Sequence, residues 1–281
     1  MYYFLKWISA LLGLLSSAGL DKLAKVVGFV SYNVLGVRKN LVHRNLATAF
    51  PNLSPEQTHA VAGKAYYNFA ATVLELLANK DTRAVGDCQF VGRENMEKAL
   101  EKGKGAFVLC AHLGNWEVLG AAVNNKIRTV RVVVKKVGSD SVDRFVDEKR
   151  TEMGMLTIKR RGKMDAIREI QKALRSNWVV GMVLDQSRPD EPRLPFFGKP
   201  AKTNSSLASM WSRFDSPVIP TYICRRGINS HTIHFLPELQ KIETGSREDD
   251  IIENSKMFNR TLEEMITKNP EQYFWLHDRW K

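Results

Sequence analysis

Short apolar runs alternate with helix-like stretches from residue 90 onward. Runs rich in β-branched residues, as buried strands are, occupy residues 107–111, 130–134, 178–184 and 218–223. Helical periodicity between and around them marks residues 94–102, 115–125, 140–154, 163–176, 203–214 and 248–268. Residues 231–236 alternate polar and apolar side chains, which is typical of an edge strand. Strands and helices alternating at this spacing predict an α/β fold with a helix-covered, largely parallel central sheet.

The first 80 residues have a different pattern and are expected to be helical throughout. In residues 55–79 the apolar side chains recur every four residues, at Val61, Ala65, Phe69, Val73 and Leu77. We therefore expect an N-terminal helical, membrane-associating region over residues 1–80 and an α/β core over residues 81–281, within a single structural domain overall.

Residues 1–20 combine a short apolar run with aromatic and basic side chains at one end. Tyr2, Tyr3 and Trp7 flank the single cation, Lys6, a combination typical of a lipid interface. The uncharged run that starts at Trp7 has 14 residues, fewer than the roughly 18 to 20 that cross a bilayer as a straight helix. The pattern favours a retained helical anchor that lies in the membrane or inserts shallowly; two ordinary core helices and a cleaved secretory signal are the alternatives.

The net charge limits the class of binding partner, and the cysteines indicate the cellular compartment. The 281 residues carry a formal net charge of +12, which implies an acidic partner such as anionic lipid headgroups, an acidic carrier protein, a phosphorylated substrate or nucleic acid. The basic residues are scattered and match no nucleic-acid-binding motif, so we expect no nucleic-acid partner. Cys88, Cys110 and Cys224 are widely spaced and form no Cys-x-x-Cys pair, which favours a reduced protein facing the cytoplasm.

One histidine stands where an α/β sheet places its ligands, just after a strand. His112 follows the apolar run 107–111, and Gly114 permits a sharp turn. Asn115 is a candidate N-cap for the next helix. Glu117, in the first helical turn, can then accept a hydrogen bond from one imidazole nitrogen. The other nitrogen is left as a base, which suits transfer of a group to a substrate alcohol.

The segment Ala-His-Leu-Gly-Asn-Trp-Glu at residues 111–117 resembles the first sequence block of the bacterial lipid A late acyltransferases, part of the glycerolipid acyltransferase superfamily with its His-x4-Asp/Glu dyad. Further blocks of that family occur in the same order along nearly the whole chain: Asn45-Leu46-x3-Phe50-Pro51, Asp185-Gln186, Pro195-Phe196-Phe197-Gly198 with Ala201 and Thr203, Val218-x-Pro220, and Pro270-Glu271-Gln272-Tyr273-x-Trp275-Leu276-His277-x-Arg279. The combination is far more specific than any one block.

The resemblance implies that His112 deprotonates a lipid hydroxyl, which attacks the thioester of an acyl carrier protein, while Glu117 orients and charge-balances the histidine. The acceptor would be a lipid A precursor or another anionic glycolipid, at the cytoplasmic face of the bacterial inner membrane. Coenzyme A as the donor and an aminolipid as the acceptor stay open. The resemblance also implies a basic residue near the acyl carbonyl or a phosphate, and either Arg160 or Arg161 stands in the matching stretch.

Several further residues are candidate substrate contacts, Asn115 among them. Asp185 and Gln186 end the most apolar strand, and we expect them to contact polar groups of the substrate or to support the site loop, without a chemical role. Arg188 follows on that loop as a candidate phosphate ligand. The rings of Phe196 and Phe197 suit an acyl chain, although core packing explains them equally well.

The residues give less support to other functions. An acyl thioesterase or other hydrolase would use the same base on water, but a Gly-x-Ser-x-Gly elbow is absent from the sequence. His231 and His234 lie on opposite faces of an alternating strand, so we expect no metal site. No P-loop or dinucleotide fingerprint occurs, so no cofactor is expected. A nonenzymatic anionic-lipid binder would explain the charge but not the His112 segment.

Overall fold

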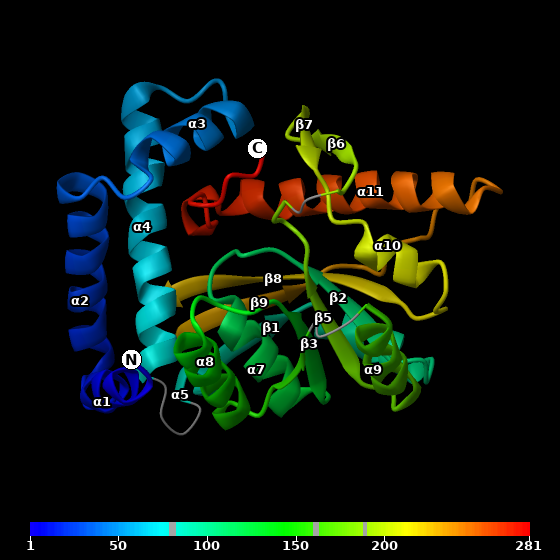
Figure 1. The fold of residues 1–281 in the computed structure, drawn as a ribbon, viewed down its shortest axis with the longest axis horizontal. Coiled ribbons are helices and arrows are strands. Elements are labelled where there is room, and N and C mark those ends of the chain that lie inside the picture. Colours follow the sequence, from blue (N-terminus) through cyan, green and yellow to red (C-terminus); the bar gives the residue numbers. More distant parts are fainter. Residues whose placement is uncertain (79–82, 160–162, 188–189) are drawn as a thin grey trace.

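A seven-stranded sheet forms the centre of the computed structural model, which describes residues 1–78, 83–159, 163–187 and 190–281 (Figure 1). The strand order is β1-β9-β8-β2-β5-β3-β4, and every neighbouring pair is parallel except β8 and β9. The strands are β1 (Asp87–Val91), β2 (Ala106–Cys110), β3 (Val130–Val134), β4 (Leu156–Lys159), β5 (Val179–Val183), β8 (Val218–Gly227) and β9 (Ser230–Phe235). A separate antiparallel hairpin consists of β6 (Arg193–Phe196) and β7 (Lys199–Lys202).

Helices cover both faces of this sheet, because side chains alternate along each strand. On β2, Phe107 and Leu109 belong to one core cluster, whereas Val108 and Cys110 belong to another. The first cluster is covered by α3 (Lys39–Ala49), α4 (Pro55–Ala78), α9 (Lys163–Arg175), α10 (Ser206–Trp211) and α11 (Arg247–Lys268). The second is covered by α6 (Arg93–Glu101) and α7 (Trp116–Lys126), with α8 (Asp140–Glu152) against β4 and the short α5 (Arg83–Gly86) against β1.

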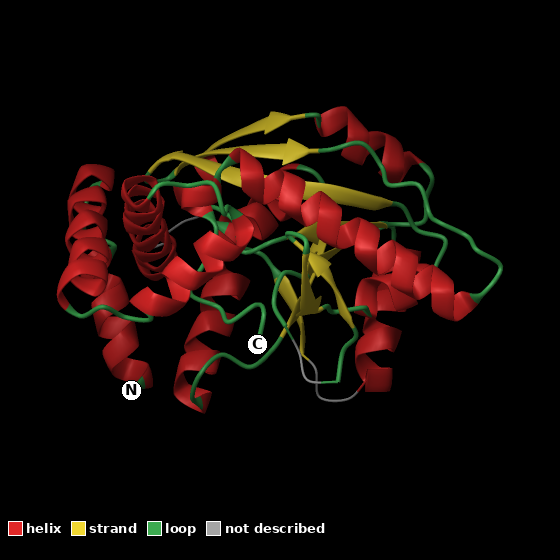
Figure 2. Cartoon of the chain, turned by 90° about the horizontal axis from the view of Figure 1, so that it is seen from above, coloured by secondary structure: helices red, strands yellow, loops and turns green. Residues whose placement is uncertain are grey.

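The N-terminal helices form a separate layer against α4. They are α1 (Tyr2–Leu12), α2 (Ser17–Phe29) and a π-helical turn over Val30–Val34. α2 lies close to α4 because Gly28 has no side chain: a Cβ atom there would be 2.8 Å from the Cα of Tyr67. In the view turned by 90° (Figure 2), these helices stand at one edge of the molecule. Among the described residues, no helix combines the length and the apolar character that crossing a membrane requires.

The predicted α/β architecture with a mostly parallel, helix-covered sheet is confirmed. The assignment of residues 231–236 to an edge strand is wrong, because β9 lies between β1 and β8. Its alternation reflects two different faces: His231, Ile233 and Phe235 are buried, whereas Thr232 and His234 on the other face are half-buried. The division into two regions at residue 80 stays a prediction.

Candidate active site

The candidate site begins where β2 ends, at a turn built around Gly114. Gly114 has a φ of +60°, and a Cβ atom there would lie 2.1 Å from the carbonyl oxygen of Ile223, so only glycine fits. The C-terminal segment holds the turn from the other side. The Phe274 N–H donates to the His112 carbonyl at 2.9 Å, and the Gly114 N–H donates to the Gln272 carbonyl at 3.0 Å. The loop that carries His112 is therefore fixed between β8 and the C-terminal segment.

Asn115 caps α7, as the sequence predicts. Its side-chain oxygen accepts hydrogen bonds from the backbone N–H groups of Glu117 and Val118, both at 3.1 Å, which satisfies two donors that the helix leaves open. Its amide nitrogen donates to Glu75 Oε2 at 2.7 Å, and the residue is fully buried. Asn115 therefore fixes the start of α7, and its role as a substrate contact stays a prediction.

His112 pairs with a carboxylate from the neighbouring strand. β2 and β5 are parallel, with Cys110 opposite Val183, so His112 and Asp185, each two residues further on, leave the sheet at the same edge. The His112 Nδ1 lies 2.8 Å from Asp185 Oδ1. The Asp185 side chain is 1% exposed, whereas that of His112 keeps 21% of its surface open. The carboxylate therefore anchors the ring through Nδ1, and the partly exposed ring keeps Nε2 for other contacts.

Glu117 does not make the hydrogen bond to His112 that the sequence analysis expects. Both of its oxygens pair with Arg150 of α8: Oε2 is 2.8 Å from Nε, and Oε1 is 2.6 Å from Nη2. The cause is burial, because a buried carboxylate gains two charge-assisted hydrogen bonds from a guanidinium in this geometry. Burial lowers the pKa of Arg150, but Glu117 outweighs this effect and the pKa lies above its ordinary value. Arg150 was missed because it lies on a different helix, far along the chain.

Asp185 keeps its charge although it is buried. Burial by itself raises the pKa of this carboxyl, but the interaction and hydrogen bond with His112 outweigh it and hold the pKa below its ordinary value. Burial, followed by the charge of Asp185, raises the pKa of Tyr273 well above its ordinary value, so this phenol stays neutral. Sequence reasoning gave Asp185 no chemical role, yet its carboxylate is the one that meets His112.

A buried polar network beneath the turn ties it to α4 and β8. Glu75 of α4 and Arg225 of β8 form an ion pair at 2.5 Å, with side chains at most 3% exposed. Arg225 also donates to the Thr72 hydroxyl oxygen at 3.0 Å, and that hydroxyl donates to the Gly114 carbonyl at 3.1 Å. Because Glu75 also accepts from Asn115, one network supports both sides of the turn that presents His112.

Aromatic rings surround the exposed part of His112. The ring of Trp116 lies 4.8 Å from the imidazole between centroids, in an edge-to-face arrangement. The ring of Phe274 is 6.1 Å from His112 and 4.7 Å from Phe69. These contacts hold the imidazole plane and give the site an apolar rim.

The remaining candidates are placed as follows. Gln186 is half-buried next to Asp185. Phe196 is fully buried beneath the guanidinium of Arg279, which lies 4.5 Å from its ring centroid. Phe197 packs against Phe50 and Trp275, with centroids 5.4 and 6.4 Å away. Both rings belong to an aromatic cluster with the C-terminal segment, and their contact with an acyl chain stays a prediction.

The three candidate arginines, Arg160, Arg161 and Arg188, lie outside the described residues. Their proposed contacts with a phosphate or an acyl carbonyl therefore stay predictions.

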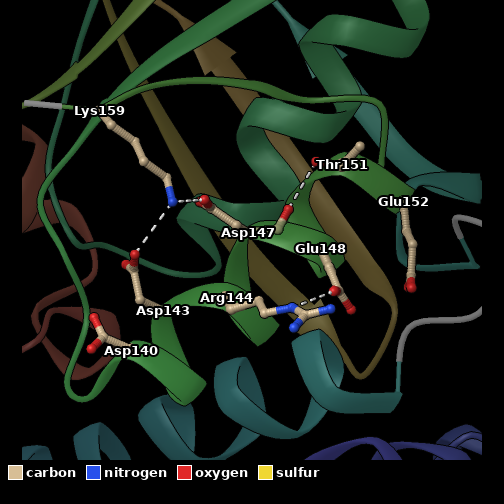
Figure 3. A pocket seen from close by; sticks show the side chains of 8 residues that line it. All are labelled: Asp140, Asp143, Arg144, Asp147, Glu148, Thr151, Glu152 and Lys159. Atoms are coloured by element: carbon tan, nitrogen blue, oxygen red, sulfur yellow. Dashed lines mark hydrogen bonds and ion pairs between the residues drawn. The ribbon is translucent and has the colours of Figure 1, made fainter. Parts of the chain in front are cut away.

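A cavity of about 730 Å³ lies on another part of the molecule, along α8. Figure 3 shows the side chains of Asp143 and Asp147 turned toward the ammonium group of Lys159, and Arg144 paired with Glu148. The lining is predominantly acidic, so it is unsuited to an anionic substrate. The turn that carries His112 is therefore the better candidate for the active site.

The fold and the site together define an α/β enzyme with a histidine–carboxylate pair at the carboxyl edge of a parallel sheet. The family model described as bacterial lipid A biosynthesis acyltransferase matches residues 1–281, so the chain belongs to this family and is an acyltransferase. It is similar to the lipid A biosynthesis palmitoleoyltransferase of Escherichia coli (strain K12), with 21% identity over 262 residues covering 91% of this chain and 82% of the relative. The lipid A biosynthesis acyltransferase of Shigella flexneri matches with the same identity and coverage. The resemblance seen in the sequence blocks is confirmed.

Proposed function

We propose that this enzyme transfers a fatty acyl chain from the thioester of an acyl carrier protein to a hydroxyl of a lipid A precursor, with His112 as the general base. One observation carries the proposal: in a chain of this family, His112 is anchored through Nδ1 to the buried Asp185 at 2.8 Å. This contact sets the ring so that Nδ1 carries a proton and Nε2 is a free base. The strong positive charge of the chain suits an acidic carrier protein as the donor.

The chemistry follows from that tautomer. His112 Nε2 takes the proton of the acceptor hydroxyl as its oxygen attacks the thioester carbonyl carbon. The tetrahedral intermediate collapses, the carbon–sulfur bond breaks, and the departing thiolate takes the proton from Nε2. Asp185 stabilises the imidazolium that forms in between, while Glu117 acts as a positioning residue that joins the first turn of α7 to α8 through Arg150.

An apolar crevice beside the histidine suits the acyl chain. It lies between α7 and the strands β2, β3 and β5, and it begins at Trp116, whose ring contacts His112. All of its lining residues are apolar: Val108, Cys110, Trp116, Leu119, Gly120, Val123, Val130, Val132, Val179, Gly181 and Val183. The crevice holds only about 30 Å³ as it stands, so binding of an acyl chain there would require α7 to move outward from the sheet.

Membrane association, at the cytoplasmic face of the inner membrane, completes the proposal. The acceptor of a lipid A acyltransferase is a lipid, and the exposed side chains of α1 include Tyr3, Phe4 and Trp7. Aromatic residues at the end of a short amphipathic helix favour an interfacial position.

The test has two assays. Mass spectrometry compares the membrane lipids of cells with and without the gene. An acyl-transfer assay compares the purified His112→Ala variant with the purified wild type. We expect His112→Ala to lower turnover by about 10²- to 10⁴-fold, because general-base catalysis is lost, in a protein that still folds. His234→Ala, which removes a half-buried histidine of β9, should keep full activity.

Two results would contradict the proposal. The first is a lipid profile that is the same with and without the gene. The second is full turnover by His112→Ala. If the enzyme releases free fatty acid at the same rate whether or not an acceptor lipid is present, the enzyme is a hydrolase and the proposed acyl transfer is wrong. Acylation of an aminolipid instead of a lipid A precursor would correct the acceptor alone.

A further inference from the structure

A second cavity adjoins the His112 site, between the start of α3 and the C-terminal segment. Its volume is about 460 Å³, which lies within the range of small-ligand sites. The lining residues are Arg38, Leu41, Ser187, Lys202, His277 and Asp278, together with Lys281. Ser187 follows Asp185 by two residues, and His277 lies three residues after Phe274, whose N–H holds the His112 carbonyl. The two chain segments that contact His112, the one after β5 and the C-terminal one, therefore also line this cavity.

Three cationic side chains line this cavity, those of Arg38, Lys202 and Lys281, and none has a carboxylate partner among the described residues. The Arg38 side chain makes one hydrogen bond, from Nη1 to the Leu276 carbonyl at 2.9 Å, which leaves its other donors available. The ammonium of Lys202 has no ion pair within the described part of the chain. The single acid in the lining, Asp278, is already paired with Arg44 at 3.0 Å. The cavity is therefore electropositive, and a bound anion would relieve the repulsion between its cations.

Neutral hydrogen-bond donors complete the lining. The Ser187 N–H donates to His277 Nε2 at 3.0 Å, so the proton of the neutral imidazole sits on Nδ1 and is available as a donor. Burial lowers the pKa of His277, which keeps the ring neutral. Leu41 belongs to the first turn of α3, where backbone N–H groups lack intrahelical partners and the helix dipole favours an anion.

The backbone at Arg38 is held in an unfavourable conformation. Its φ is 54°, in the left-handed region that costs a non-glycine residue energy. This conformation begins α3 and turns the arginine toward the C-terminal segment, where it meets Leu276. Strain of this kind is common where a residue is held for ligand binding.

We infer that this cavity binds the phosphate group of a substrate, through Arg38, Lys202 and the donors beside them, while the reacting groups meet at His112. The inference rests on the proposed acyl transfer for its two candidate sources. One source is a phosphate on the glycolipid acceptor, and the other is the phosphodiester that links pantetheine to an acyl carrier protein. Both present the same tetrahedral anion, for which guanidinium and ammonium groups are suitable partners.

The experiment measures binding and turnover separately with the full chain. For the acceptor, the inactive variant His112→Ala is titrated with a glucosamine-based glycolipid that carries phosphate and with the same lipid after phosphatase treatment. For the donor, KM is measured for an acyl carrier protein thioester and for a short acyl thioester without phosphate. Each measurement is repeated with Arg38→Gln and with Lys202→Met, after thermal unfolding has verified that each variant folds. Lys199→Met is the matched control, because it removes an exposed lysine from the same strand as Lys202.

The expected result is a loss of about tenfold or more per cation removed, in one of the two arms and only for the probe that carries phosphate. A loss in the glycolipid titration identifies the acceptor phosphate, and a raised KM for the carrier protein identifies the donor. Unchanged constants in both arms, or equal losses with Lys199→Met, would overturn the inference. If glycolipid binding depends on Lys202 but wild type transfers no acyl group, the phosphate site stands and the proposed reaction falls.

Discussion

Two carboxylates lie close to the turn that carries His112, and their substitution should have different effects. Asp185→Asn keeps the shape of the side chain but removes the charge that anchors the imidazole and stabilises its protonated form. We expect kcat to fall by about 10²- to 10⁴-fold with little change in KM. Glu117→Gln should lower kcat less and reduce thermal stability, because it weakens the buried pair with Arg150. Steady-state kinetics and thermal unfolding of the two variants separate these effects.

The control for both is Asp215→Asn, which removes an exposed acid paired with Lys104 and should change neither quantity. A larger loss of kcat in Glu117→Gln than in Asp185→Asn would mean that Glu117 supports His112 during turnover, as the sequence alone suggests.

The buried pair of Glu75 and Arg225 makes a prediction about stability. Burial raises the pKa of Glu75, but the imidazole of His231, 3.6 Å away, and the charge of Arg225 outweigh it and lower the pKa to about 2. Glu75→Gln leaves a buried guanidinium without its charge partner, so we expect a loss of about 3 to 5 kcal/mol in the free energy of unfolding at pH 7. Urea unfolding measures it.

The pH dependence follows from the direction of that shift. A carboxyl whose pKa is lower in the folded state contributes stability above its unfolded pKa, near 4.3. This contribution is lost as the pH falls toward 2, so the difference between wild type and Glu75→Gln should shrink over that range. Glu97→Gln, in the exposed pair with Arg93, should cost less than about 0.5 kcal/mol at either pH. A difference that stays constant with pH would contradict the charge-based explanation.

The sequence located part of this site, but the acid that contacts His112 is not the one that the sequence suggests, and the difference has a physical reason. His112 and the Asn115 cap follow from local pattern, since a strand end, a glycine and an N-cap are neighbours in the chain. The pairing of His112 with Asp185 depends instead on β2 and β5 being adjacent in the sheet, which no local pattern specifies. The Glu117–Arg150 pair likewise depends on how α7 and α8 pack. The sequence therefore points to the acid that is near His112 along the chain, whereas the acid that contacts His112 is near it in space.

At the scale of elements, strands that are continuous apolar runs were predictable from the sequence, and exposed strands with polar residues were not. The strands β2, β3, β5 and β8 are recognisable because buried parallel strands are continuous apolar runs. By contrast, β1 and the hairpin strand β7 are largely exposed and carry polar residues, and β7 contains Pro200. Such segments are strands because of their partners, and their own side chains carry little β signal.

The apolar crevice between α7 and the sheet yields a prediction about chain length. A Cβ atom at Gly181 would lie 3.5 Å from Val132 Cγ2, an ordinary contact, so the position accepts a side chain. Gly181→Val should therefore fill part of the crevice, and thermal unfolding verifies that the variant folds. We expect the preference to move to shorter acyl donors, on the order of tenfold in kcat/KM, because each excluded methylene loses about 0.8 kcal/mol. Competition between donors of different length, read by mass spectrometry, measures it.

The matched control is Gly227→Val at the end of β8, where a Cβ atom meets nothing within 4 Å. It should leave the chain-length profile as in wild type. A folded Gly181→Val enzyme with an unaltered profile would mean that the acyl chain binds elsewhere.

At the scale of the whole molecule, α1 has one face against α4 and α8 and another open to solvent. The Tyr2 hydroxyl hydrogen-bonds to Glu148 of α8, and Lys6 forms an ion pair with the same carboxylate at 3.5 Å. The large apolar side chains at this end stay exposed: Tyr3, Phe4, Trp7, Leu11 and Leu14 in or just after α1, Val26 and Phe29 on α2, and Val34 and Leu35 at the end of the π-helical turn. Figure 1 shows α2 outside α4, away from the sheet, and α1 at the lower end of α4. Exposed apolar area of this kind marks an interaction surface.

That surface predicts binding to anionic membranes. Wild type should co-sediment with vesicles that contain phosphatidylglycerol more than with pure phosphatidylcholine vesicles, and added salt should weaken the binding because the net charge of +12 contributes. The double variant Phe4→Ser, Trp7→Ser should bind on the order of tenfold to a hundredfold more weakly, since each ring that leaves the interface loses on the order of 1 kcal/mol.

The control is the double variant Val91→Ser, Leu156→Ser, which removes exposed apolar side chains from β1 and β4 and should bind as wild type does. Equal binding by both double variants would place the membrane contact on another face, and a wild type that stays in the supernatant with both vesicles would contradict the interfacial role of α1.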